Sequence, residues 1–157
     1  MIVTLTGLML TAAAAKAPDF GPAAPIATMN RLARMQRAVE AGNDPVRAAV
    51  RTAQLARLEA LVQYMNRVEA RMQSGAFRSE EWFNMLQVMR DVTDAGVAVS
   101  VLPEEALCWR RVGLDMAWSH YRMAVARGQS QLVDQSRAQL EFMRGHYTTT
   151  RERCTVR

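Results

Sequence analysis

The 157-residue sequence is poor in the residue types that build most catalytic and metal-binding sites. It holds two histidines, two cysteines and a single lysine, Lys16, beside abundant arginine. It contains no CxxC pair, no CxxCH haem-attachment sequence, no glycine-rich phosphate loop and no nucleophile-elbow sequence. We therefore expect the protein not to be an enzyme, and we assign it no cofactor.

The N-terminal apolar run is shorter than the about 20 residues that a transmembrane helix needs. This run is typical of an export signal instead. Ile2 to Leu10 form the apolar core, and Ala13-Ala14-Ala15 offers a cleavage site before Lys16. No basic residue precedes the core, so a retained apolar helix in a cytoplasmic protein is the alternative.

These features predict three parts of the chain. Residues 1–15 are expected to be a signal peptide, residues 16–27 a linker rich in proline and alanine, and residues 28–157 one folded domain. The expected location is therefore the periplasm or the exterior of the cell, and the cytoplasm if the leader is not a signal.

Charge alternates along the chain in three blocks. Residues 29–78 and 106–157 are each net positive by five, whereas residues 79–105 are net negative by five. An acidic block between two basic ones favours charge matching inside the fold, whereas a nucleic-acid interface is usually a basic stripe without such partners. Nucleic-acid binding by a cytosolic basic protein remains the alternative function.

From Thr28 onward the apolar residues recur at helical spacing, which predicts an all-α fold: an antiparallel bundle of four to five helices. Helix-start and helix-stop residues divide the chain. The expected boundaries are a first helix from Thr28 to Gly42, a second from Asp44-Pro45 to Ser74-Gly75, a third from Ser79 to Gly96, a fourth from Pro103 to Gly128, and a fifth from Ser130 to His146.

Several apolar residues are expected to face the core of this bundle. Val46 and Val50 continue the apolar stripe of the second helix, and Trp118 and Val125 lie on that of the fourth. Residues 97–102 are expected to form a buried connector, because a single strand would have no partner with which to pair.

Cys108 and Cys154 allow only one intramolecular disulfide. In an antiparallel hairpin around Gly128, the two cysteines differ by six residues in distance from the turn, or about 9 Å of helix. A non-helical tail can close that difference. We expect the bond in an oxidising compartment, and two thiols in a reducing one.

Met116, His120 and Met123 lie at positions i, i+4 and i+7, on one face of the fourth helix. Thioether and imidazole groups suit Cu(I) or the axial positions of a haem, so a metal or haem near His120 is a further alternative. Methionines at this spacing more commonly fill a core. Ser119 is adjacent to His120 and points about 100° away, which excludes this pair as nucleophile and base.

Arginine clusters near aromatic residues are candidates for binding an anionic partner. The candidate arginines are Arg110, Arg111, Arg122, Arg151 and Arg153, with Trp109 beside the first two. Solvated helix faces and intramolecular pairing with the acidic third helix explain the same residues. The leading hypothesis is therefore an exported helical bundle that acts by binding another protein.

Overall fold

The computed structural model describes residues 23–38 and 44–147, and five α-helices account for most of this part of the chain. They are α1 (Ala23–Ala38), α2 (Pro45–Gln73), α3 (Ser79–Val99), α4 (Pro103–Arg127) and α5 (Ser130–His146). No strand occurs within the described ranges. The predicted all-α bundle is confirmed.

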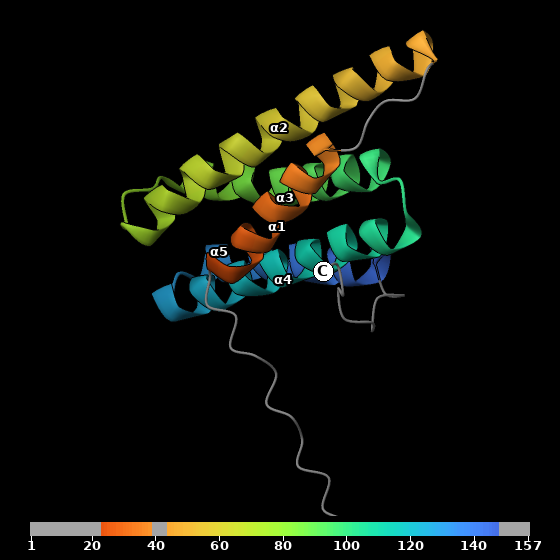
Figure 1. The fold of residues 1–157 in the computed structure, drawn as a ribbon. Coiled ribbons are helices and arrows are strands. Elements are labelled where there is room, and N and C mark those ends of the chain that lie inside the picture. The colour runs from red at the N-terminus through yellow and green to blue at the C-terminus, as the bar shows by residue number, and fades with distance from the viewer. Residues whose placement is uncertain (1–22, 39–43, 148–157) are drawn as a thin grey trace, which may run out of the picture.

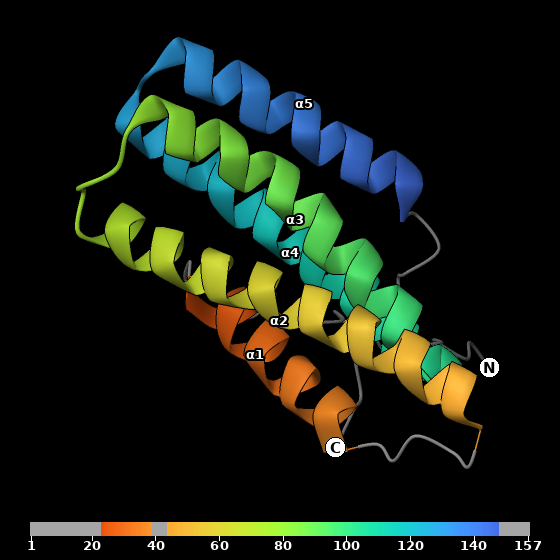
Figure 2. The same cartoon turned by 90° about the horizontal axis from the view of Figure 1, so that it is seen from above.

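Helices α3 and α4 form the centre of the bundle (Figure 1). Helix α2 packs against α3, and α5 packs mainly against α4. Each helix from α2 to α5 runs roughly antiparallel to the one before it (Figure 2), and α1 packs against both α2 and α4. Short connections between amphipathic helices favour this arrangement, because each helix buries its apolar face against its neighbour in the sequence.

Several of the predicted helix boundaries are confirmed in atomic detail. The Asp44 side chain accepts hydrogen bonds from the amides of Val46 (3.0 Å) and Arg47 (3.3 Å), with Pro45 as the first helical residue. Gly128 ends α4 with a φ of 68°, in the left-handed region that glycine adopts without steric cost.

The predicted end of the third helix is wrong. Helix α3 continues through Gly96 to Val99, and the buried backbone of Gly96 lies against the ring of Trp109. Glycine at this position permits close packing instead of ending the helix. The connector is accordingly shorter than expected, and its Val101 and Leu102 side chains are exposed.

Four residues expected in the core are exposed instead: Val46 (71%), Val50 (53%), Trp118 (44%) and Val125 (51%). The first turns of α2 lie beyond the other helices, as the orange end of α2 shows in Figure 1. On α4, packing by α1, α3 and α5 leaves one face open, and Trp118 and Val125 lie on that face.

Helix α1 begins at Ala23, so residues 23–27 of the predicted linker are helical. The predicted signal peptide lies outside the described residues. None of the helices in the described ranges is long and apolar enough to cross a membrane.

A buried polar cluster joins four segments at one end of the bundle. The Gln36 amide nitrogen donates to the Glu105 carboxylate (2.8 Å), which also accepts from the amides of Val101 (2.9 Å) and Leu102 (3.3 Å). Arg51 donates to the carbonyls of Gln36 and of Val99 at the end of α3. This cluster fixes α1 and α2 on the α3–α4 hairpin.

Candidate functional site

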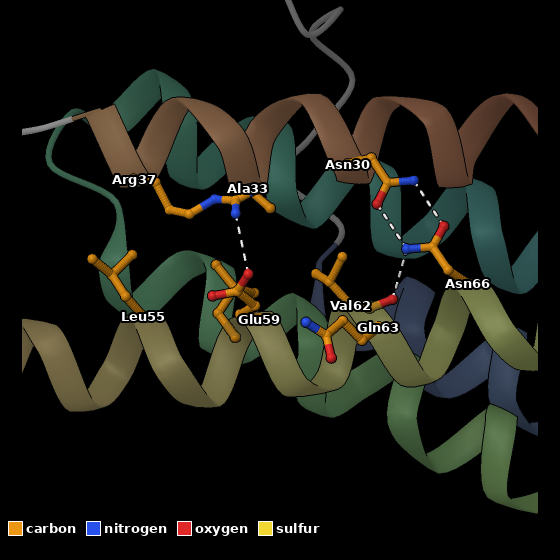
Figure 3. Close-up of a pocket in the computed structure, with 9 residues that line it drawn as sticks. Asn30, Ala33, Arg37, Leu55, Glu59, Val62, Gln63 and Asn66 are labelled. Carbon is orange, nitrogen blue, oxygen red and sulfur yellow. Dashed lines mark hydrogen bonds and ion pairs between the residues drawn. The ribbon is translucent and has the colours of Figure 1, made fainter.

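A groove of about 180 Å³ lies between α1 and α2. Its floor is apolar: Ala33 of α1 and Leu58 and Val62 of α2 are buried there, beside the half-buried Leu55. These residues face one another because they occupy the helix positions that turn toward the partner helix. Figure 3 shows the groove with α1 above and α2 below.

Two polar bridges between the helices mark the ends of the groove (Figure 3). At one end Asn30 and Asn66 exchange two hydrogen bonds of 2.8 Å, and at the other the Arg37 guanidinium lies 3.1 Å from the Glu59 carboxylate. The bridges are seven residues apart along each antiparallel helix, which corresponds to about 10 Å. The groove is therefore short, apolar at its base and polar at its ends.

The side chain of Gln63 is the remaining polar group on the wall of the groove, and it is exposed. The volume is below the ~300–1,000 Å³ typical of small-molecule and cofactor sites. A site of this size and lining suits one or two side chains of a bound polypeptide, with its backbone outside the groove.

His120 lies fully buried on α4, at the centre of the bundle. Its Nδ1 is 3.0 Å from the Met116 carbonyl oxygen, its ring packs on Trp82 with centroids 5.5 Å apart, and its Nε2 has no hydrogen-bond partner. Burial lowers the pKa of His120 to about 4, although the Met116 carbonyl raises it in part. The ring is therefore neutral at physiological pH.

Of the two methionines considered as ligands in the metal or haem alternative, Met116 is buried and Met123 is half-buried. The described residues contain no group of three or more His, Cys, Asp and Glu side chains that could hold a metal ion. A metal or haem at His120 stays a prediction.

Cys108 is buried on α4, near the end of the α4–α5 hairpin that is opposite the Gly128 turn. Cys154, its predicted partner, lies outside the described residues, and the disulfide stays a prediction.

The predicted anion-binding arginines do not form one cluster within the described residues. Arg111 is paired with Asp115 (3.1 Å), whereas Arg110 lies near Tyr147, where its charge opposes the burial that raises the pKa of that hydroxyl. Trp109, the aromatic residue next to Arg110 in the sequence, is fully buried and is not accessible to an anionic partner. Arg122 is exposed on α4, and Arg151 and Arg153 lie outside the described residues.

A second exposed surface surrounds Trp118. Its ring lies 5.8 Å from that of Tyr121 on α4, and the Arg144 guanidinium of α5 lies 5.6 Å from the ring centroid. Tryptophan, tyrosine and arginine are enriched at the centres of protein interfaces. The α1–α2 groove differs in having a defined volume with buried apolar residues at its base, so we regard it as the better candidate.

Sequence reasoning missed the groove, because its two walls come from helices whose facing residues lie up to 36 positions apart. One signal was visible: residues 29–78 carry an excess of arginine, and both walls lie within that block. No protein-family model matches this chain, and neither does any curated protein or any solved structure.

Proposed function

We propose that this protein is exported and acts outside the cytoplasm by binding another protein at the α1–α2 groove. The observation that carries the proposal is the groove itself. It combines an apolar floor with polar ends and an opening to solvent, and it has less space than a typical cofactor needs. Interfaces between proteins share this pattern of an apolar centre within a polar rim.

Support for export comes from the sequence of the leader, with its apolar core from Ile2 to Leu10 and its small residues before Lys16. The position of Cys108 is compatible with a disulfide bond to Cys154 in an oxidising compartment. Helix α5 ends next to Tyr147, which lies near Arg110, two residues from Cys108 on α4. The seven residues from Thr148 to Cys154 can span up to about 25 Å, enough to return to Cys108.

Photocrosslinking in living cells tests protein binding at the groove. The photoreactive residue p-benzoylphenylalanine replaces Gln63 on the groove wall in the full chain, and Gln131, exposed on α5, in a matched control. We expect irradiation to give a protein adduct of one defined mass at position 63 and not at position 131. The proposal fails if position 63 yields no adduct, or if both positions yield the same one.

A further inference from the structure

We propose that the partner segment which enters the α1–α2 groove is acidic, and that it places an aliphatic or aromatic side chain on the groove floor between arginines of the two helices. The inference rests on the proposed function and adds the chemistry of the partner. The inference depends on the arginines next to the groove. Their positive charge is not balanced by nearby carboxylates, whereas the charged residues inside the groove are paired with each other.

Two arginines border the groove on its solvent side: Arg34 of α1 and Arg67 of α2. At about 100° per residue, Arg34 lies about 60° around the helix axis from the groove residue Arg37, and Arg67 lies about 40° from the groove residue Gln63. Both arginines are therefore at the outer edge of the groove, and both side chains are exposed.

These arginines have no acidic partner within the described part of the chain, where no carboxylate lies within 4.0 Å of either of them. The carboxylate on the groove wall, Glu59, is already bound by Arg37 at 3.1 Å. The expected charge matching with the acidic block reaches α2 through Arg71, which lies 2.7 Å from Glu81, and leaves the groove edge uncompensated. A partner that carries carboxylates would supply the missing charge.

The floor decides between an acidic polypeptide and a nucleic acid. Single-stranded nucleic acids are held by aromatic side chains on which bases stack, together with a basic path for the phosphates. The groove has aliphatic residues at its base, namely Ala33, Leu55, Leu58 and Val62, and no aromatic ring among the residues that line it. An apolar side chain matches this floor, and neighbouring Asp or Glu residues match its edges.

The test uses a random 16-residue peptide library displayed on phage and selected on the full chain. We expect the enriched peptides to carry net negative charge and at least one apolar residue between acids. A synthetic peptide of the enriched sequence should bind the R34E/R67E variant at least about tenfold more weakly, because two favourable charge contacts become repulsive.

The R57E/R137E variant is the matched control, because it changes the net charge by the same amount. Arg57 lies on the side of α2 opposite the groove, and Arg137 lies on α5. We expect this variant to bind the peptide nearly as well as the wild type. The neutral variant R34Q/R67Q should weaken binding by an intermediate factor, and circular dichroism shows whether each variant is folded.

Each remaining result overturns the inference in a distinct way. Enriched peptides that are not acidic, or that bind the R34E/R67E variant as tightly as the wild type, refute the acidic partner but leave protein binding intact. Loss of their binding in W118A would move the site to the Trp118 surface. Absence of any enriched peptide, with a labelled DNA or RNA oligonucleotide bound through Arg34 and Arg67, would refute both proposals.

Discussion

The ring of Trp109 on α4 lies directly on the backbone of Gly96 on α3. A Cβ atom at position 96 would lie 2.0 Å from Cδ2 of the indole and 2.4 Å from two further ring carbons. Trp109 is fully buried in the close-packed interior. The close approach of the two central helices at this point therefore requires the absence of a side chain at Gly96.

Substitution Gly96→Ala should destabilise the protein severely, because the added methyl overlaps the ring and forces α3 and α4 apart. We expect a loss of about 3 kcal/mol or more in the free energy of unfolding, at the upper end of overpacking costs. Urea unfolding followed by circular dichroism measures it. The control is Gly145→Ala on α5, where a Cβ meets nothing within 4 Å and should change stability by less than about 1 kcal/mol. Equal stabilities of the two variants would contradict the packing described.

The predictable parts of the fold are those that depend on neighbours in the sequence. Asp44-Pro45 and Gly128 act through hydrogen bonds and φ angles within their own turn, so their roles follow from residue type alone. Gly96 shows the limit of this reasoning. A glycine near an apolar segment predicts a helix end, but α3 continues to Val99, and the ring of Trp109, 13 residues later in the chain, accounts for the glycine at this position.

Val46 and Val50 were wrongly predicted to be buried, again because the prediction used only neighbours in the sequence. Helical periodicity indicates which side of α2 is apolar, but it does not show how far the other helices extend along it. Val46 and Val50 share the apolar pattern and lie beyond the end of the packed region. The groove was missed because the Asn30–Asn66 and Arg37–Glu59 pairs depend on how α1 crosses α2.

Protonation of His120 should destabilise the folded state at mildly acidic pH. Its pKa is about 4 when folded and about 6.5 when unfolded, so the unfolded chain takes up the proton first. The contribution is complete above pH 6.5 and is lost as the pH falls toward 4, up to about 3 kcal/mol.

Urea unfolding between pH 7 and 4 checks this loss. In His120→Gln the loss due to this group should disappear. An NMR titration of the ring in the native protein provides an independent measurement. A His120 ring that titrates near 6.5 would contradict the structure.

Substitution Glu105→Gln should weaken the cluster that joins α1, α2 and α4. Burial raises the pKa of Glu105, but the hydrogen bonds from Gln36 and from two backbone amides, with the charge of Arg51, outweigh it and hold the pKa below 4.5. We expect a cost of about 1–3 kcal/mol at pH 7, measured by urea unfolding.

The pH dependence of this cost has a definite sign. Because the folded pKa is lowered, the stabilisation from ionised Glu105 is present above pH 4.5 and is lost as the pH falls through the folded value. The difference between wild type and Glu105→Gln should therefore shrink at lower pH. The variant Glu104→Gln, at the neighbouring exposed position, should cost little at pH 7, and an equal cost in both variants would argue against the cluster.

Substitution Cys154→Ser should lower stability only under oxidising conditions, because it removes the proposed disulfide to Cys108. A closed loop of this size contributes about 3–4 kcal/mol, mainly by restricting the unfolded chain. Thermal unfolding with and without a reducing agent measures the effect, and the variant should match the reduced wild-type protein. Identical melting of wild type and variant without reductant would exclude the bond.

The intact mass of the protein, purified without a reducing agent from cells that express the full chain, tests the proposed export most directly. We predict a mature chain that begins at Lys16 and is two hydrogens lighter than its reduced form, because cleavage and oxidation both follow passage out of the cytoplasm. A mass that corresponds to a chain beginning at Met1, with two thiols that react with an alkylating reagent, would contradict it.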